Sequence, residues 1–231
     1  MGSVLRLVLA LGICGIAAES AGAADGRLYP SGPPNGVAYL RFANLSPAAV
    51  KVSSAGGALD LPTSDAQRVG EFDPVTPGTE LTGTVAIGDR TAPIKLTLKQ
   101  NEFVTVAVTA AAEGPPTVTL LREEPSDFNA QKSALALYNV DKNCAEAELL
   151  AGDRHTVVVS GVKPGATGRR LVNPVNVALS VGCGAEGGKA TGVELGAMAA
   201  GDRYSVFIYA GPGSAGRQAL ALTDKMAPFR P

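Results

Sequence analysis

The sequence contains no tryptophan, a single histidine and aromatic residues at only 5% of its 231 positions. Sugar-binding sites usually stack the sugar ring on an aromatic face, so this shortage counts against a carbohydrate-binding role. The net charge is only −1, which gives no basic surface for nucleic acid. The composition therefore predicts no nucleic-acid partner, while a hydrophobic content of 45% is enough for packed cores.

A hydrophobic run long enough to span a bilayer is also missing. The apolar stretch 7–16 is too short to cross one, follows the lone basic residue Arg6 and precedes Ala21-Gly22-Ala23. This order is typical of a secretory signal peptide over residues 1–23, cleaved at Ala23 or Ala24. We therefore predict an exported protein of the periplasm with no stable membrane insertion.

A lipoprotein acylated on Cys14 is the alternative interpretation of this segment. Ile13 stands where a lipoprotein signal needs a small residue, and Cys14 lies within the apolar run itself. The pattern therefore favours signal-peptide cleavage over lipid anchoring.

Removal of Cys14 with the signal would leave two cysteines, Cys144 and Cys183. An even number in an exported chain predicts one disulfide, although two free thiols stay possible because sequence alone gives no geometry. Two cysteines and one histidine make a poor ligand set, so we expect neither a metal nor a cofactor.

Short segments of alternating polarity, separated by Gly, Pro, Asp or Asn, continue throughout the chain. None has helical periodicity over three turns. Fourteen of them read as strands at the spacing of antiparallel sandwiches. They span residues 37–44, 49–53, 68–72, 80–87, 93–98, 103–109, 117–121, 133–138, 146–150, 155–160, 175–181, 192–195, 204–209 and 218–222.

The polar, proline-containing stretch 123–132 interrupts this pattern. We interpret it as an interdomain linker, in which Glu123 and Glu124 form a charge pair with no implied role. The predicted fold is all-β, with two tandem antiparallel β-sandwich domains over residues 24–122 and 133–231, the second including a C-terminal tail.

The two halves also resemble each other. The stretch 39–45 alternates apolar and polar residues up to Asn44, and the stretch 134–140 does the same up to Asn139. A turn, a charged residue, an aromatic residue and renewed alternation recur at 101–107 and 201–207. These matches predict a tandem duplication.

A catalytic interpretation would centre on His155, with Asp153 and Ser160 as partners. Neighbours along one strand alternate faces, and no Gly-x-Ser-x-Gly elbow is present to expose a nucleophile. We therefore predict that His155 is a half-exposed strand residue.

Gly-Asp-Arg occurs three times, at 88–90, 152–154 and 201–203. A repeated anion-binding turn is one interpretation. A simple turn between two strands of a hairpin is favoured, because Gly and Asp tolerate the backbone angles of turns and Arg would begin the next strand. A Gly-Asp-Ser nucleophile motif would need Ser where each copy has Arg.

Arg169 and Arg170 are predicted to lie in a long loop between Ser160 and Val175. Two adjacent guanidinium groups could bind a carboxylate, although such pairs are often simply solvated. We regard this loop as the best candidate contact surface, because irregular segments on sandwiches often carry function.

Three stretches carry a resemblance to a known family: Leu28-Tyr29-Pro30, the strand 36–46 and the Asn-Pro-Val strand 172–179. In this order they resemble the AlgF family of periplasmic alginate O-acetylation proteins, over residues 28–209. The cysteine pair is not a feature of that family. The resemblance implies two β-sandwich domains and a non-catalytic accessory role, with no catalytic residues to carry over.

The function that the resemblance implies is that of an adaptor for O-acetylation of an exopolysaccharide. Its partners would be the periplasmic and membrane-anchored O-acetyltransferase proteins of that machinery. The alternative is a module that binds the polysaccharide itself, holding a uronate polymer through Arg169, Arg170, Arg41 and Lys51. An enzyme is the third and least favoured class.

Overall fold

The computed structural model describes residues 36–228 except for 66, 126, 185–189 and 214–215. Every regular element in these residues is a strand, which confirms the prediction of an all-β protein. The predicted signal peptide, with Cys14, Ala23 and Ala24, lies outside the described residues. No helix long and apolar enough to cross a membrane occurs in the described part of the chain.

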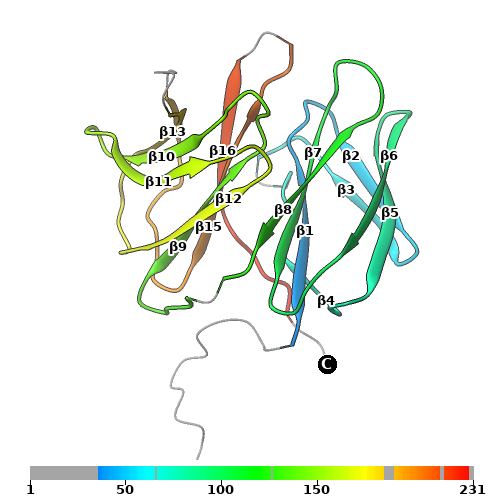
Figure 1. Cartoon of the computed structure of the whole chain (residues 1–231), viewed down its shortest axis with the longest axis horizontal. Coiled ribbons are helices and arrows are strands. Elements are labelled where there is room, and N and C mark those ends of the chain that lie inside the picture. The colour runs from blue at the N-terminus through cyan, green and yellow to red at the C-terminus, as the bar shows by residue number, and fades with distance from the viewer. Residues whose placement is uncertain (1–35, 66, 126, 185–189, 214–215, 229–231) are drawn as a thin grey trace, which may run out of the picture. The chain divides into compact units, whose positions relative to one another are not determined.

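The first eight strands form two four-stranded sheets, ordered β4-β1-β7-β8 and β3-β2-β5-β6 (Figure 1). The strands are β1 (Ala38–Asn44), β2 (Val50–Ser54), β3 (Gly57–Leu61), β4 (Asp73–Val75), β5 (Glu80–Ile87), β6 (Arg90–Thr97), β7 (Phe103–Thr109) and β8 (Thr117–Glu123). Apolar residues from both sheets, among them Leu40, Val52, Val85 and Val106, form one core between them. This is the first sandwich.

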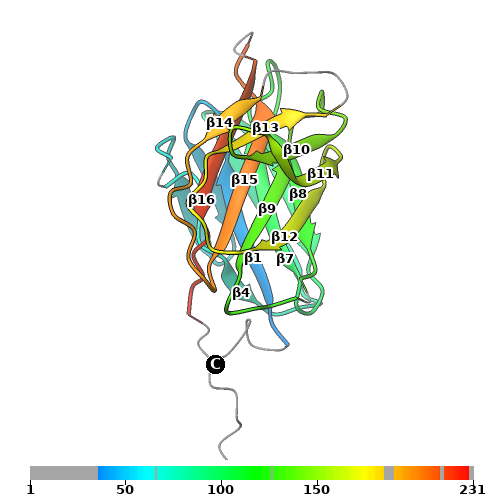
Figure 2. The ribbon, with the colours of Figure 1, turned by 90° about the vertical axis from the view of Figure 1, so that its left-hand side faces the viewer.

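The last eight strands repeat the arrangement, with sheets ordered β12-β9-β15-β16 and β11-β10-β13-β14 (Figure 2). The strands are β9 (Ser133–Asn139), β10 (Ala147–Ala151), β11 (Thr156–Val162), β12 (Thr167–Val172), β13 (Leu179–Cys183), β14 (Thr191–Val193), β15 (Arg203–Ala210) and β16 (Arg217–Thr223). Leu137, Leu149, Val181 and Val206 lie in the core of this second sandwich.

The two sandwiches agree in strand order and in the direction of every pairing. In each, the first strand pairs in parallel with the seventh, β1 with β7 and β9 with β15, whereas the other pairs are antiparallel. Asn44 and Asn139, at the ends of β1 and β9, each accept a hydrogen bond from the backbone N–H two residues later. This correspondence is what a tandem duplication predicts.

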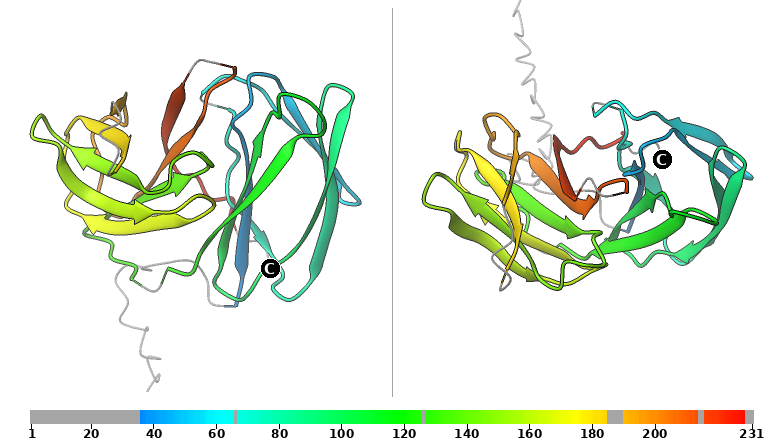
Figure 3. Two further views of the ribbon diagram at one scale, coloured as in Figure 1. Left: turned by 45° about the horizontal axis from the view of Figure 1, so that its top comes forward. Right: turned by 90° about the horizontal axis from the view of Figure 1, so that it is seen from above.

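The sheets that contain β1 and β9 face each other across the junction between the sandwiches (Figure 3). A third apolar cluster lies between them, with Ala43 and Leu121 from the first sandwich and Tyr138, Phe207 and Leu220 from the second. The central strands are thus covered on both faces. This is why β1 and β9 carry apolar residues at the positions that face either side of the sheet.

Two predicted segments differ from the structure, and one strand was not predicted. Residues 68–72 contribute only isolated bridges at Val69 and Phe72, and the regular strand is the next segment, β4, where Pro74 is tolerated at a sheet edge. Residues 175–178 precede β13 and are not a strand. Strand β3 was not predicted, because its exposed edge position leaves no core-facing alternation to recognise.

The predicted loop that contains Arg169 and Arg170 is also wrong, because residues 167–172 form strand β12, paired with β9. A Cβ at Gly168 would come within 2.6 Å of the side chains of Val159 and Val162. Glycine therefore allows β12 to cross close over β11, and here it marks a close approach of two strands.

The predicted linker lies against the rest of the protein. Its first residue, Glu123, ends strand β8 and is buried. Asp127 forms an ion pair with Arg169, and Phe128 packs on the cluster of Tyr39 and Phe103. The exact domain boundaries stay a prediction, but this segment contacts both sandwiches.

Candidate functional site

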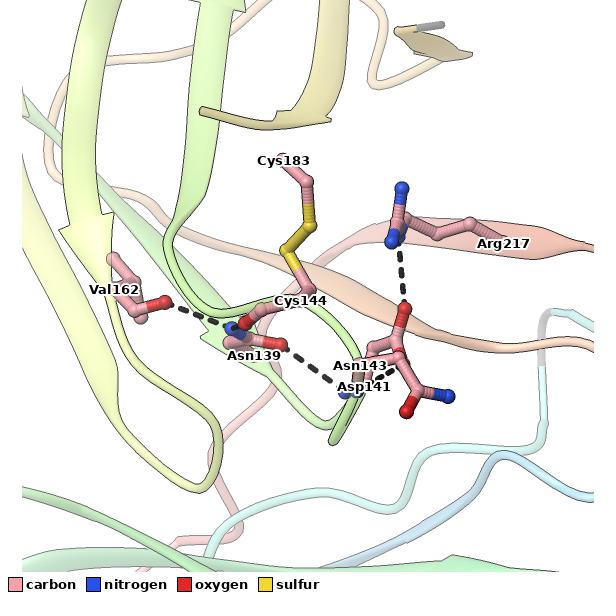
Figure 4. Close-up of a disulfide and its surroundings, with 7 residues drawn as sticks. All are labelled: Asn139, Asp141, Asn143, Cys144, Val162, Cys183 and Arg217. Carbon is pink, nitrogen blue, oxygen red and sulfur yellow. Dashed lines mark hydrogen bonds and ion pairs between the residues drawn. A yellow bond between two sulfur atoms is a disulfide. The ribbon is translucent and has the colours of Figure 1, made fainter. Parts of the chain in front are cut away.

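The structure joins Cys144 and Cys183 in a disulfide, with their Cα atoms 5.5 Å apart (Figure 4). Both cysteines lie in the core of the second sandwich. The Asn139 side chain next to them donates to the carbonyls of Cys144 and Val162, each at 2.8 Å. The disulfide therefore fastens the turn after β9 to the end of β13.

His155 lies in the turn before β11, exposed and with a positive φ of 49°. The prediction of a strand position is therefore wrong, since the turn Gly152–His155 extends one residue further. No hydrogen bond joins His155 to Asp153 or Ser160 in the described part of the chain. The structure does not assemble these residues into a catalytic triad.

The three Gly-Asp-Arg sequences lie at turns, and two of them lead directly into a strand. Gly88, Gly152 and Gly201 all have positive φ, and Arg90 and Arg203 begin strands β6 and β15. Arg203 has a second role that the turn interpretation missed, because its side chain is 11% exposed and points into the junction.

A buried polar cluster at the junction is organised around Arg41, which is 1% exposed. Its Nε donates to Thr105 Oγ1 at 2.9 Å, since β1 and β7 place these two residues side by side. Its Nη1 donates to Asp224 Oδ1, and its Nη2 to Ser205 Oγ, both at 2.7 Å. Arg41 thus connects β1 of the first sandwich with β15 and the residue after β16 of the second.

Tyr138 and Glu123 extend this cluster. Arg41 Nη2 lies 3.3 Å from the Tyr138 hydroxyl, which donates in turn to Glu123 Oε1. Arg203 Nη2 lies 3.5 Å from Glu123 Oε2, and Arg203 Nε lies 3.7 Å from Asp224 Oδ2. The two cations and two carboxylates balance each other, which is the condition for burying charge.

Aromatic rings cover the two arginines. The Arg41 guanidinium lies 4.0 Å from the ring centre of Phe72, and that of Arg203 lies 4.4 Å from the ring centre of Phe103. Such cation–π contacts are stronger when the cation is desolvated, as it is here.

Two ionisation shifts follow from this environment. Burial is the largest single influence on the pKa of Arg41 and lowers it, but the charge and hydrogen bond of Asp224 together with Tyr138 and Glu123 outweigh burial, so the net shift is upward and Arg41 stays charged. Burial, and then the nearby charge of Glu123, raise the pKa of Tyr138 far above its usual range. Tyr138 therefore stays a neutral hydrogen-bond donor.

The sequence alone did not predict this cluster, and it led to a wrong role for Arg41. Arg41 was a candidate contact for a polymer, yet it is buried. Glu123 was given no role, yet it accepts from Tyr138. The sequence did contain one sign of this cluster. Arg41 lies in a strand with apolar residues on both of its faces, and such a strand is expected to be buried on both faces. Its partner Asp224 lies 183 residues away and carries no local signal.

Arg169 and Arg170 lie apart from the junction cluster. Arg169 pairs with Asp127, and its guanidinium lies 5.9 Å from the ring centre of Phe128. Arg170 is exposed and donates to the carbonyl of Val158 at 3.1 Å. No group of three or more residues able to hold a metal occurs in the described residues.

Comparison with known proteins gives one consistent family. The family model described as "Alginate O-acetyl transferase AlgF" matches residues 8–205. The alginate biosynthesis protein AlgF of Pseudomonas aeruginosa is 30% identical over 178 residues, which cover 76% of this chain and 74% of that protein. The AlgF protein of Pseudomonas syringae pv. tomato is 30% identical over 201 residues, covering 87% and 82% respectively.

Solved structures are more distant. A Bacteroides uniformis protein described as a cell-adhesion candidate aligns with 83% of this chain and 100% of its own at 12% identity. Its TM-score is 0.28, which is too low to support an argument about fold or function.

Proposed function

Because this chain belongs to the AlgF family and thus has a role in alginate O-acetylation, we propose that it acts there as a non-catalytic accessory protein of the periplasm. In this proposal it contacts acetyltransferase proteins of the machinery and does not transfer the acetyl group itself.

The observation that carries the proposal is that the side chains most able to take part in catalysis are engaged with one another at the junction. The cluster that holds two hydroxyls, a phenol, two carboxylates and two guanidinium groups is buried at the junction. Ser205 Oγ accepts from Arg41 and donates to Asp224 at 2.6 Å. The O–H of this buried hydroxyl is therefore engaged with Asp224 and its oxygen with Arg41, so the group joins the sandwiches and is not presented to a substrate.

The same cluster supports an adaptor in a second way. A buried network and an apolar cluster that span the junction fix two sandwiches in one arrangement. An adaptor that positions two partners needs such a fixed arrangement, because an interface held in advance costs less ordering entropy on binding. The exposed Arg170 stays the sequence-based candidate for one contact.

Binding of the polymer itself is the weaker alternative. Of the four basic residues assigned to it, Arg41 is buried and Arg169 is paired with Asp127. Only Arg170 and Lys51 are left exposed, on different strands of different sandwiches. The structure therefore brings no set of free cations together at these positions.

The test is reconstitution with the O-acetyltransferase proteins of an alginate-acetylation machinery. We expect the exported protein to co-purify with at least one of them and to increase acetylation of the polymer. The protein alone should give no acetyl-ester turnover, and a His155→Ala variant should behave like wild type. Acetyl transfer by the purified protein alone at an enzyme-like rate would falsify the proposal, and so would consistent failure to contact any acetyltransferase.

A further inference from the structure

A cleft of about 560 Å³ opens where loops of the first sandwich meet the β15–β16 hairpin of the second. One wall consists of residues 45–47 and 109–112, and the other of residues 210–213 with Gln218. The volume lies in the ordinary range for binding clefts. Unlike the Arg41 cluster, this part of the junction is open.

Among the described residues that line this cleft, Arg68 and Arg90 are the charged ones and none is Asp or Glu. Two guanidinium groups without a carboxylate in the lining give the cleft a positive potential. A concave, weakly solvated surface strengthens such a potential. The charge therefore favours an anionic ligand.

Arg90 is held in place but keeps donors free. Its Nη1 donates to the carbonyls of Ala111 and Gly114, at 3.2 and 3.3 Å. In the described part of the chain Arg90 has no ion pair, and its Nε and Nη2 donate to no protein acceptor. A guanidinium oriented in this way can offer a carboxylate two parallel N–H groups.

Arg68 supplies a buried charge at the junction. It is 9% exposed, and its Nη2 donates to the carbonyl of Ser46 at 2.9 Å while its Nη1 lies 3.4 Å from the Tyr209 hydroxyl of the second sandwich. Among the described residues it forms one ion pair, with Asp65 at 3.3 Å, and because Asp65 is 78% exposed it neutralises little of the charge. Arg68 Nε is buried and has no hydrogen-bond partner in the same part of the chain.

The walls indicate which kind of anion fits. They consist largely of Ala, Gly and Pro, and no aromatic residue is among the lining residues. A sugar acid would need rings to stack on and many polar side chains for its hydroxyl groups, whereas only Ser46, Thr109 and Gln218 offer neutral ones. An acidic polypeptide segment, in contrast, needs an apolar surface for its backbone and a positive charge that pairs with its carboxylate.

We infer that this cleft binds an acidic segment of a partner protein, with one of its carboxylates on the free donors of Arg90 above the positive charge of Arg68. The bound segment contacts both sandwiches at once. This inference rests on the proposed adaptor function, since it names where and by what chemistry a partner is held.

The test uses an Arg90→Glu variant, with Arg154→Glu as its matched control. Arg90 and Arg154 are both exposed, and Arg154 lies in the β10–β11 turn away from the cleft lining. We expect Arg90→Glu to weaken binding of the acetyltransferase partner at least tenfold and Arg154→Glu to leave it within twofold. Retention of binding by Arg90→Glu would overturn the cleft inference while leaving the adaptor function intact.

A second arm tests the cleft without the partner. A hexaaspartate peptide, titrated at low salt, should shift the amide NMR signals of the non-proline residues within 45–47, 109–112 and 210–213, and Arg90→Glu should abolish the shifts. Absence of these shifts in the wild type would overturn the inference. So would shifts produced by a mannuronate hexamer and not by the peptide. If the wild type binds no acetyltransferase, the adaptor function fails, and the peptide titration alone then decides whether the cleft takes an acidic segment.

Discussion

Arg41 is a residue whose environment is supplied by both sandwiches. Thr105 comes from the same sheet, whereas Ser205, Tyr138 and Asp224 come from the other sandwich. Burying an ion pair gives little net stability, but removing one partner leaves a charge in a site that water cannot reach. The residue therefore specifies how the sandwiches meet more than it adds to their stability.

An Arg41→Met variant should lose about 3–5 kcal/mol in the free energy of unfolding, because the buried Asp224 loses its 2.7 Å ion pair and keeps only the longer one to Arg203 at 3.7 Å. Urea denaturation measures the change. Lys51→Met, on the exposed face of β2, is the control and should stay within about 0.5 kcal/mol of wild type. Adding Asp224→Asn to Arg41→Met should recover part of the loss. A single variant as stable as wild type would contradict the assigned role.

Tyr138 gives a prediction on the alkaline side. Its pKa is raised in the folded state, by burial first and by Glu123 second, so the folded protein keeps a proton that the unfolded chain releases near pH 10. The stability that this proton supports is complete below pH 10 and is lost as the pH rises above it. Burial raises the pKa of Tyr39 and Tyr209 as well, which acts in the same direction.

The free energy of unfolding should therefore fall above pH 10, by about 1.4 kcal/mol per pH unit for each retained proton. Urea denaturation between pH 8 and pH 11 measures this slope. Tyr138→Phe should be less stable at neutral pH by about 1–3 kcal/mol, because Glu123 loses a donor, and its alkaline slope should be shallower by one proton. An unchanged slope in this variant would sink the explanation.

Among the secondary-structure elements, strands that face a core could be predicted from the sequence. Strands β5 and β7 lie where the alternation placed them, and β1 and β9 differ by a residue at one end. Edge strands were harder, because β3 is exposed and β12 contains a glycine that its close crossing over β11 requires. Alternation of apolar and polar residues indicates which positions of a strand are buried. At a sheet edge, however, burial depends on which other strand packs beside the edge strand.

The candidate site was less predictable than the strands. Arg41 and Asp224, or Arg68 and Tyr209, come together only when the two sandwiches pack, and no spacing in the sequence reports that event. The disulfide was predictable because only two cysteines follow the predicted signal peptide, so that only one pairing is possible between them. The sequence offered no such elimination for charged residues.

The paired asparagines at the ends of β1 and β9 allow an element-scale test of the duplication. Asn44 donates to the carbonyls of Ala48, Leu61 and Pro62, and Asn139 to those of Cys144 and Val162. Replacing either by Ala leaves buried carbonyls without a donor, so each variant should lose about 2–3 kcal/mol in thermal or urea unfolding. Asn143→Ala, at an exposed position nearby, should change little. Opposite outcomes at positions 44 and 139 would argue against equivalent roles.

The disulfide reinforces only the second sandwich. Reduction should lower the free energy of unfolding by about 4 kcal/mol, the loop-closure term for a separation of 39 residues. Unfolding of the same protein with and without dithiothreitol measures it. A Cys144→Ala, Cys183→Ala double variant should be insensitive to the reductant. Equal stability of the oxidised and reduced wild type would contradict a stabilising bridge.

At the scale of the whole molecule, the C-terminal segment fastens the second sandwich to the first. After β16 the chain returns toward the first sandwich, where Asp224 meets Arg41 and Met226 forms a bridge with Phe72 (Figure 1). Phe72 N donates to the carbonyl of Lys225, and Ala227 N donates to that of Phe72, at 2.9 and 3.0 Å. Because of these contacts and the apolar cluster, we expect the two sandwiches to unfold together as a single cooperative unit.

Deleting residues 224–231 should uncouple the sandwiches, because it removes the Asp224 carboxylate and the backbone bonds to Phe72. We expect calorimetry to show one transition for the wild type and two, at lower temperature, for the shortened chain. The radius of gyration in solution scattering should increase. A chain lacking only 229–231 is the control and should match the wild type. A single unshifted transition after the longer deletion would show that the segment is dispensable for coupling.

The parallel pairing of β1 with β7, and of β9 with β15, has a consequence for how quickly the protein can fold. Tyr39 pairs with Phe103, and Arg203 with Ala134, so neither central pair can form until most of its sandwich has been brought together. Chains rich in such non-local contacts fold slowly, because loop-closure entropy is spent before the contacts form. During that interval apolar strands are open to pairing with other chains, so we expect newly made molecules to be prone to aggregation until both sandwiches have closed.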